Sequence, residues 1–348
     1  MDRRPLAVLT TSYPADSRDG AGTFVRGFCR ACVRAGLPVE VLCPELPSGP
    51  GDPGDDGITV RRLAYARPRR LQGLSTLPGA PDWLAASGWR WGSAGAFAAR
   101  LSATLAHRHR RYRGLVSHWL VPSTLAGALA GGSRRHVGIA HGTDVWLLER
   151  LPGRRAVAQA LAARTARLVF VSEALRRRFA RVAGGPVARC RVQPMGVEPL
   201  PRVDRQAARA RFRLAGTVWL WMGRFVPVKA PQRALERLAN APEATLVFAG
   251  AGPLEPELRA RAQRFGDRVR FVGWVSGEAK AQLFAAADAM LFTSTTLADG
   301  RGEGAPVALQ EARAYGLPLI GESMGVDRAT PLEWDAALAR MLGGVFLP

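Results

Sequence analysis

Apolar and amphipathic stretches alternate through the second half of the chain. Short apolar runs begin near residues 217, 245, 268, 289 and 317. Segments with helical spacing begin between them, near residues 230, 254, 276 and 307. Short apolar runs that alternate with helical patterns predict parallel strands joined by crossover helices. The second half is therefore predicted to form a Rossmann-like, doubly wound parallel sheet.

The first half opens on the same alternation. Leu6–Thr11 predicts a strand, 23–35 predicts a helix that ends at Gly36, and 39–43 predicts the next strand. Further strands are predicted at 114–119, 136–140 and 167–171. Residues 44–81 are rich in Pro, Gly and Asp, so a long loop is expected there.

Chain length and hinge signals divide the protein into two domains. A chain of 348 residues is long for one hydrophobic core. The Pro- and Gly-containing segment 194–201 predicts a crossover, which places an N-terminal domain at 1–202 and a C-terminal domain at 203–348. Thr330-Pro331 predicts the start of a final helix at about 331–343. The predicted fold class is α/β, with two Rossmann-like doubly wound parallel-sheet domains.

Positive charge is concentrated in the first half of the chain. The formal net charge is +21, and residues 1–191 carry +18 of it, with 30 Lys/Arg against 12 Asp/Glu. Arginines at 61–70 and 108–113 flank the segment WLAASGWRW at 83–91. Mixed Trp and Arg are typical of an interfacial membrane segment, and Trp in a core with Arg at its rim is an equal alternative. No nucleic-acid module is recognisable and the second half is nearly neutral, so no nucleic acid is expected as a partner.

The lack of predicted targeting signals and the pattern of cysteines both indicate a cytoplasmic protein. No apolar run approaches the ~20 residues of a membrane-spanning helix, and MDRRP leads directly into a strand, so no signal peptide is predicted. Cys29 and Cys32 form a C-x-x-C pair within the predicted first helix. A redox pair belongs at a helix start, so we expect these cysteines to pack in the core.

The segment 300–321 contains two carboxylates. Glu303 lies in a Gly-rich turn, and Glu311 lies one turn into a helix that begins near Pro306. Pro is tolerated at a helix start, where the free N–H groups form an anion site. Carboxylates accept hydrogen bonds from vicinal hydroxyls, so the pattern fits a nucleotide sugar. Taken alone, the spacing favours a surface helix whose glutamates face water.

Two cations are predicted at the carboxyl end of a strand in the same domain. Arg224 and Lys229 follow the apolar run 217–222, and open parallel sheets bind ligands at such ends. Only two of the 49 basic residues are lysines, Lys229 and Lys280, so composition alone would place Arg here. The alternative is a solvated basic residue at a helix start.

In their order along the chain, the motifs resemble the retaining GT-B glycosyltransferases of family 4 (group 1). The matching stretches are SYPADSRDGAGTFVRGF, HGTDVW, VSEALRRRF, VQPMGVE, GRFVPVKAPQ, AGAGPLEPEL, VRFVGWVSGEAKAQLFAAAD and the segment 300–321. They cover nearly the whole chain as far as Gly325. Beyond Gly325 the chain departs from the family pattern, because a strand and a helix are missing before the final helix. A shortened C-terminus is therefore expected.

The resemblance implies transfer of a sugar from a nucleotide diphosphate donor, with retention, to a glycan or lipid-linked acceptor. The donor is a substrate, and no cofactor or metal is expected. The chain has no Asp-x-Asp pair to hold a divalent ion, so Arg224 and Lys229 would stabilise the departing diphosphate instead. The basic first domain suits peripheral contact with an anionic membrane surface. Two rivals remain open: a nucleotide-sugar 2-epimerase of the same fold and an inactive truncated paralogue.

The resemblance also assigns individual residues. Glu303 would hold the donor sugar's hydroxyls, Glu311 the ribose, and His141 would reach the donor from the first domain. The remaining donor contacts would come from the N–H groups of Gly304, Ala305 and Val307, from the loop with Gly20 and Gly22, and from Val275 and Lys280 beside the base. The role of Asp144 is left open.

Overall fold

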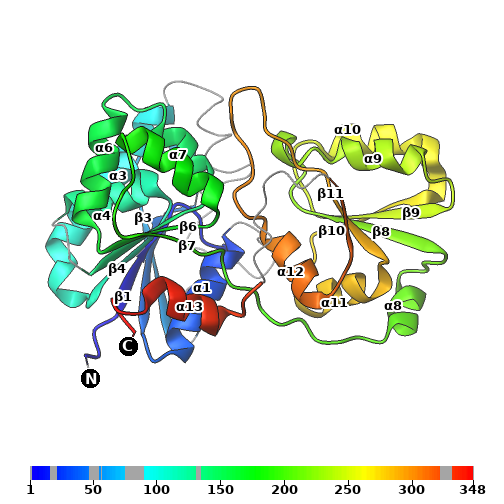
Figure 1. Cartoon of the computed structure of the whole chain (residues 1–348), viewed down its shortest axis with the longest axis horizontal. Helices are drawn as coiled ribbons and strands as arrows, with labels where there is room; N and C mark the ends of the chain where they lie inside the picture. The colour runs from blue at the N-terminus through cyan, green and yellow to red at the C-terminus, as the bar shows by residue number, and fades with distance from the viewer. Residues whose placement is uncertain are drawn as a thin grey trace. The chain divides into compact units, whose positions relative to one another are not determined.

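The chain folds into two compact units. The computed structural model describes residues 2–15, 22–46, 55, 57–74, 90–130, 135–321 and 331–347. The first unit comprises Met1–Gly196 and Trp334–Pro348, and the second comprises Val197–Glu333 (Figure 1). The sequence predicts a boundary between residues 202 and 203, whereas the compact units divide between Gly196 and Val197.

The first unit is built on a parallel sheet. Within the described ranges, its strands follow the order β3-β2-β1-β4-β5-β6-β7. They are β1 (Leu6–Leu9), β2 (Val39–Pro44), β3 (Ile58–Leu63), β4 (Gly114–His118), β5 (His136–Ala140), β6 (Arg167–Phe170) and β7 (Cys190–Val192). β1, β4 and β5 are buried along their whole length, as strands covered on both faces must be. Neighbouring strands are parallel, so their carboxyl ends share one edge.

Helices and short turns connect these strands. They are α1 (Thr23–Arg34), α3 (Arg90–Arg108), α4 (Leu125–Leu129), α5 (Thr143–Leu148), α6 (Arg154–Arg164), α7 (Glu173–Ala183) and α13 (Trp334–Leu342), with the turns η1 (Arg69–Leu71), η2 (His109–Arg111) and η3 (Leu120–Thr124). Cys29 and Cys32 are fully buried on α1, which confirms the predicted core role. Burial raises the pKa of both thiols, so neither is poised as a thiolate.

Helix α13 packs on α1 through Trp334. A Cβ atom on Gly27 would lie 2.8 Å from the indole Nε1, and one on Gly196 would lie 2.7 Å from the Trp334 Cα atom. Only glycine leaves room for the tryptophan at both positions. The helix begins at Trp334 rather than near residue 331, because the peptide before it pairs with another segment: the Val197 N–H donates to the Leu332 carbonyl oxygen, and Glu333 forms a β-bridge with Val197.

Strand β3 and helix α3 are among the elements of the first unit that the sequence did not predict. Strand β3 lies within the predicted loop 44–81, and its exposed positions carry Arg61 and other polar residues that hide the strand pattern. Helix α3 buries Phe97, Leu101 and Leu105 at every fourth position, which is helical spacing. Trp91 of the predicted interfacial segment packs against the core of the unit, while Trp83 and Trp89 lie outside the described residues.

The second unit is a smaller parallel sheet. In its described part the strand order is β10-β9-β8-β11-β12. The strands are β8 (Thr217–Met222), β9 (Ala244–Ala249), β10 (Val269–Gly273), β11 (Ala289–Phe292) and β12 (Leu319–Gly321). The helices are α8 (Arg205–Arg211), α9 (Gln232–Ala239), α10 (Glu255–Ala262), α11 (Gly277–Ala286) and α12 (Val307–Tyr315), with the 3₁₀ turns η4 (Pro227–Lys229) and η5 (Gln263–Arg268).

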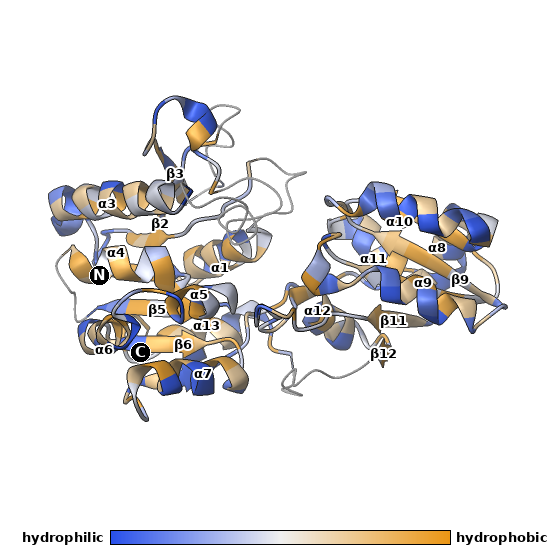
Figure 2. Cartoon of the chain, turned by 90° about the horizontal axis from the view of Figure 1, so that it is seen from above, coloured by the Kyte–Doolittle hydropathy of each residue, from blue (hydrophilic) through white to orange (hydrophobic). Residues whose placement is uncertain are grey.

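Side chains from successive residues of β8 fill the cores on opposite faces of this sheet. Leu220 packs in one cluster with Phe284 of α11, and Trp221 packs in the other with Leu235 of α9. The strand β9 is mostly orange in Figure 2, whereas α9 and α10 carry both orange and blue. A strand that is apolar on both faces, with helices packed on each face, is the pattern that the sequence predicts for a doubly wound sheet.

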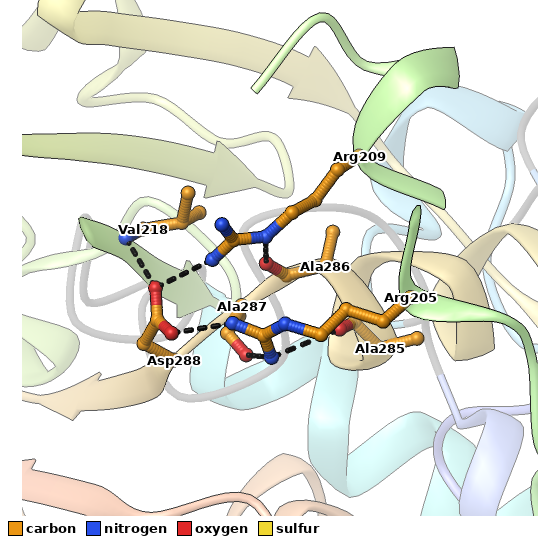
Figure 3. A network of polar contacts seen from close by, with 7 residues as sticks. All are labelled: Arg205, Arg209, Val218, Ala285, Ala286, Ala287 and Asp288. Atoms are coloured by element: carbon orange, nitrogen blue, oxygen red, sulfur yellow. Dashed lines mark hydrogen bonds and ion pairs between the residues drawn. The ribbon is translucent and has the colours of Figure 1, made fainter. Parts of the chain in front are cut away.

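Helix α8 is attached to its unit by a polar network around Asp288 (Figure 3). The Asp288 carboxylate accepts from Arg209 at 2.7 Å, from the Val218 N–H at 2.7 Å, and from Arg205. The same guanidinium groups donate to the carbonyl oxygens at the end of α11, with Arg209 on Ala286 at 3.1 Å. Cations favour a helix C-terminus, so the two arginines cap α11 while they fix α8.

The α/β fold class with two Rossmann-like parallel sheets is confirmed. Every strand and helix predicted for the second half is present in the described residues, within a few positions of its predicted start. A search of the described residues finds no helix that is both long and apolar enough to cross a membrane.

Candidate functional site

The carboxyl ends of the central strands in the second unit terminate in glycines that pack against one another. The Gly250 N–H donates to the Gly273 carbonyl oxygen at 2.7 Å, and the Gly223 N–H donates to Ala249 at 3.0 Å. A Cβ atom on Gly250 would lie 1.8 Å from the Gly223 carbonyl oxygen. Gly250 also has φ +149°, which favours glycine. The backbone at this edge of the sheet is therefore closely fixed.

Lys229 is held at this edge through its backbone. The Thr293 hydroxyl donates to the Lys229 carbonyl oxygen at 2.9 Å and accepts from the Trp221 indole N–H at 2.8 Å. The Lys229 ammonium then pairs with the Glu303 carboxylate, with 3.1 Å between Nζ and Oε2. The two side chains are only 16% and 19% exposed, so their charges are poorly screened by solvent.

A second lysine–glutamate pair joins α11 to α12. The Lys280 ammonium lies 2.8 Å from Oε1 of Glu311, and the side chains are 18% and 11% exposed. Both lysines of the chain thus pair with the two glutamates of the segment 300–321. The sequence predicted all four residues as site residues, and the structure brings them together as two pairs.

The start of α12 leaves backbone donors free between these two pairs. Pro306 is the N-cap, and its carbonyl oxygen accepts from the N–H groups of Leu309 and Gln310. In the part of the chain that the structure describes, the N–H groups of Gly304, Ala305 and Val307 have no acceptor. Free N–H groups at a helix N-terminus bind anions, and the helix dipole adds to this preference.

The other residues predicted for the second unit also lie beside its strand ends. Arg224 is partly buried in the loop after β8, where the neighbouring Phe225 N–H donates to Ala251 at 2.9 Å. Val275 follows β10 and packs against the core beside α11. Its neighbour Trp274 is 38% exposed, which is unusual for a large apolar side chain in the described residues.

In the first unit, His141 follows β5 and is partly buried. Its Nε2 atom lies 3.0 Å from Nδ1 of His118, the last residue of β4. Burial lowers the pKa of His141 to about 3, so its imidazole is neutral at physiological pH. The sequence analysis missed His118, although a histidine that ends the apolar run GLVSH on an adjacent strand is a recognisable signal.

Asp144 is fully buried and orients the loop that carries His141. Its carboxylate accepts from the N–H groups of His141 at 3.0 Å and Gly142 at 2.8 Å. The other oxygen accepts from the Leu120 N–H at 2.8 Å, across from the loop after β4. Burial raises the pKa of Asp144, and these hydrogen bonds offset that effect only in part. The contacts of Asp144 in the described residues are those of a positioning residue.

The predicted glycine loop is described only in part. Gly20 lies outside the described residues. Gly22 is the N-cap of α1 with φ +74°, and a Cβ atom there would lie 2.4 Å from the Ser12 carbonyl oxygen. The close approach that requires glycine at this position is therefore to the backbone of Ser12.

A cavity of the second unit lies apart from the charged pairs. It encloses about 290 Å³ and is lined by Arg233, Arg237, Phe292 and Thr293, among others. Apart from Thr293, none of the residues that hold or form the two lysine–glutamate pairs lines it. We place the candidate site at the charged pairs, because opposite charges beside free N–H groups offer more chemistry than a cavity lined by arginines. No group of three residues that could hold a metal occurs among the described residues.

Two parallel-sheet units, the second with cations, carboxylates and free N–H groups at its strand ends, define a protein of GT-B architecture. Solved structures share this fold over nearly the whole chain. Sucrose-phosphate synthase from Thermosynechococcus elongatus matches with a TM-score of 0.71 at 20% identity, over 98% of this chain and 89% of that one. Anabaena Alr3699/HepE, solved with UDP and glucose, matches with a TM-score of 0.64 at 18% identity, over 97% and 89%.

Two protein-family models match the sequence and together cover most of the chain. Residues 18–199 match the model described as Glycosyltransferase Family 4, and residues 216–332 match the model described as Glycosyl transferases group 1. The chain belongs to glycosyltransferase family 4.

A curated relative with a stated activity comes from Corynebacterium glutamicum. It is a GDP-mannose-dependent monoacylated alpha-(1-6)-phosphatidylinositol monomannoside mannosyltransferase, 27% identical over 233 residues. The match covers 62% of this chain and 60% of the relative.

Proposed function

We propose that this chain transfers a sugar from a nucleotide diphosphate donor to a glycan or lipid-linked acceptor, with retention of configuration. The observation that carries the proposal is the two partly buried lysine–glutamate pairs, whose glutamates flank the free N–H groups at the start of α12 in the sequence. A nucleotide sugar has anionic phosphates between two sets of vicinal hydroxyls. The site presents carboxylates at both ends of an anion-binding centre, which is the matching arrangement.

The charges suit the transition state of transfer. As the sugar leaves, negative charge grows on the diphosphate, and fixed cations stabilise that charge more than they stabilise the bound substrate. We assign this role to Arg224 and Lys229, with help from the N–H groups of Gly304, Ala305 and Val307. These groups are the proposed substitute for a divalent ion, and no cofactor is part of the proposal.

The carboxylates are assigned to the two sugars. Glu303 binds hydroxyls of the transferred sugar, and Glu311 binds the ribose, with Lys280 and the Val275 backbone near the base. In the absence of ligand each lysine neutralises its glutamate, so neither carboxylate is buried unpaired. His141 contributes a hydrogen bond to the donor, and the loop with Gly20 and Gly22 approaches the diphosphate.

The acceptor assignment is supported by charge and by one relative. The Corynebacterium relative is named for a lipid acceptor. The basic first half suits an anionic membrane surface on the cytoplasmic side, with peripheral contact. Part of this charge is internally neutralised, since Arg61 and Arg108 both pair with Glu40. The remaining exposed arginines would carry the membrane contact.

A thermal-shift assay with nucleoside diphosphates and nucleotide sugars tests the donor site. One nucleotide should raise the melting temperature of the wild type, because a ligand at 100 times its Kd stabilises by about 2.7 kcal/mol. Lys229→Ala and Glu311→Ala should abolish the shift. Arg233→Ala and Glu257→Ala remove one exposed charge of each sign from the same unit and should leave it intact.

Two results would contradict the proposal. A cooperatively melting protein that no nucleotide stabilises has no donor site. If a nucleotide still raises the melting temperature of both variants, the donor binds at another site. Release of an altered nucleotide sugar without any acceptor would instead support the epimerase.

A further inference from the structure

A histidine pair at the carboxyl edge of the first sheet is joined by one hydrogen bond. β4 and β5 are parallel neighbours, so His118 at the end of one strand lies beside His141 just after the other. The Nδ1 atom of His118 and the Nε2 atom of His141 are 3.0 Å apart, and the rings are tilted by only 15°. At this distance one nitrogen donates and the other accepts.

Both rings are neutral. His118 is completely buried, and burial lowers its pKa well below the usual range, as it does for His141. A neutral imidazole carries one N–H and one lone pair. The choice of donor in the hydrogen bond between the rings therefore fixes the tautomer of both residues.

The surroundings of His118 decide which ring donates. Its other nitrogen, Nε2, is buried and has no hydrogen-bond partner within the described ranges. The rings packed against His118 include Phe24 and Phe28, which carry no oxygen or nitrogen acceptor. If His141 donated, His118 would bear an orphaned, buried N–H, which folded proteins strongly avoid. His118 must then carry its proton on Nδ1 and donate it to His141.

The consequence for His141 follows directly. Its Nε2 atom is occupied as an acceptor, so its own proton resides on Nδ1. No residue in the described part of the chain accepts from that nitrogen, and the side chain is partly exposed. His141 thus presents an N–H donor and has no free lone pair with which to act as a base.

The backbone around the pair is held in an unusual conformation. Trp119, directly after His118, has φ +70°, which is rare for a bulky residue. Its N–H donates to Ile139 at 2.9 Å, and its carbonyl oxygen accepts from the Thr124 N–H and hydroxyl at 3.1 Å each. Backbone strain that is held by several contacts is concentrated at functional sites. The contacts of Asp144 then join this loop to the one that carries His141.

We propose that His118 is a positioning residue that fixes His141 in the Nδ1–H tautomer, and that this N–H donates to an oxygen of the nucleotide-sugar donor. The second half of this statement rests on the proposed function, and the first half does not. His118 acts only through His141.

Nitrogen-15 NMR of the imidazoles tests the tautomer without any substrate. The chain has five histidines, which makes assignment practical. His141 should show a protonated Nδ1 and an unprotonated Nε2 in the wild type. His118→Asn keeps a donor near the position of Nδ1 and should preserve this pattern, whereas His118→Leu should give a mixture of tautomers. His109→Asn changes an exposed ring of the same unit and serves as the control.

A protonated Nε2 on His141 in the wild type would overturn the inference, whether or not the His118 variants fold. An unchanged His141 pattern in folded His118→Leu would do the same.

Steady-state transfer kinetics test the functional half. His118→Leu should lower kcat by about 10-fold, by analogy with the loss when a partner that orients a metal-bound histidine is removed. His118→Asn should recover most of this loss. An equal loss of kcat in both variants would mean that His118 contributes only to core packing. A protein with the expected tautomer and no transfer activity would contradict the proposed function alone.

Discussion

At the residue scale, Asp144 shows how one buried carboxylate can fix two loops. Its three backbone donors, on Leu120, His141 and Gly142, come from the segments after two adjacent strands. Asp144→Ala would leave all three N–H groups without a partner in a buried position. We expect the free energy of unfolding to fall by about 3 kcal/mol or more, since each orphaned group costs about 1–3 kcal/mol.

Urea denaturation followed by circular dichroism measures this loss. Asp335→Ala is the control, because Asp335 is 74% exposed and its pair with Arg34 contributes little. A loss in Asp144→Ala no larger than in the control would contradict the role assigned to the carboxylate.

Gly250 and Gly316 require glycine for two different reasons, close packing at Gly250 and backbone conformation alone at Gly316. Alanine at position 250 would place its Cβ atom 1.8 Å from a backbone oxygen, so the ends of β8 and β9 must move apart. At Gly316, which follows α12 with φ +85°, nothing lies within 4 Å of the Cβ position. We expect Gly316→Ala to cost about 1 kcal/mol from backbone strain alone, and Gly250→Ala to cost at least twice that.

Chemical denaturation of the two variants compares the costs directly. Nucleotide binding gives a second readout, because Gly250→Ala displaces the backbone beside Lys229 and should weaken it, while Gly316→Ala should not. Equal effects of the two substitutions on stability and on binding would be inconsistent with the close packing at Gly250.

At the element scale, α8 depends on two arginines of unequal burial. The Arg209 side chain is 22% exposed and Arg205 is 48% exposed, although both contact Asp288. Exposed ion pairs contribute little, and hydrogen bonds to charged groups contribute more when they are shielded from solvent. Arg209→Ala should therefore destabilise the second unit by about 1–2 kcal/mol, and Arg205→Ala by less than about 1 kcal/mol.

The prediction is tested by comparing the loss of stability in Arg209→Ala with that in Arg205→Ala. Denaturation midpoints of Arg209→Ala, Arg205→Ala and the double variant would show it, and the double variant should be less than additive because both arginines share one carboxylate. A larger loss in Arg205→Ala would mean that the cap on α11 outweighs the shielded ion pair.

Sequence patterns predicted elements best where apolar residues dominate both faces. Strand β8 reads TVWLWM without interruption and was predicted at its actual bounds. Strand β3 reads ITVRRL and was missed, because Arg61 and Arg62 interrupt its apolar pattern while serving local contacts: Arg61 pairs with Glu40, and Arg62 donates to the Pro14 carbonyl oxygen. Such pairings are made by distant parts of the chain, and local sequence does not encode them.

At the scale of the whole molecule, buried histidines make stability depend on pH. Burial lowers the pKa of His136 to about 4 and lowers the pKa of His118 well below its usual range. Between a pH of about 6.5 and these lowered values the unfolded chain binds more protons than the folded one, so stability is present above 6.5 and is lost as the pH falls. Each histidine should remove about 1.4 kcal/mol per pH unit in this interval.

Urea unfolding at pH 7.5 and pH 5.0 measures the effect. His136→Gln should show a shallower dependence than the wild type, whatever its absolute stability. Equal midpoints for the wild type at both pH values would exclude the titration of buried histidines as a source of stability.

The arrangement of the candidate site illustrates what sequence could and could not supply. The chemistry of Lys229, Lys280, Glu303 and Glu311 was visible as residue types at strand ends and at a helix start. Their pairing was not, because it depends on the order β10-β9-β8-β11, which sets residues far apart in the sequence side by side. His118 was missed for the same reason, since its partner His141 lies on the next strand.

The scarcity of lysine gives the protein a built-in pair of reporters. Reductive methylation with isotope-labelled formaldehyde tags only primary amines, keeps their charge and leaves every arginine unmodified. The labelled protein should therefore give two side-chain signals, one from Lys229 and one from Lys280, besides any signal from the chain terminus. Since each amine contacts a different glutamate, the two signals would report independently on occupancy at the two ends of a bound nucleotide sugar.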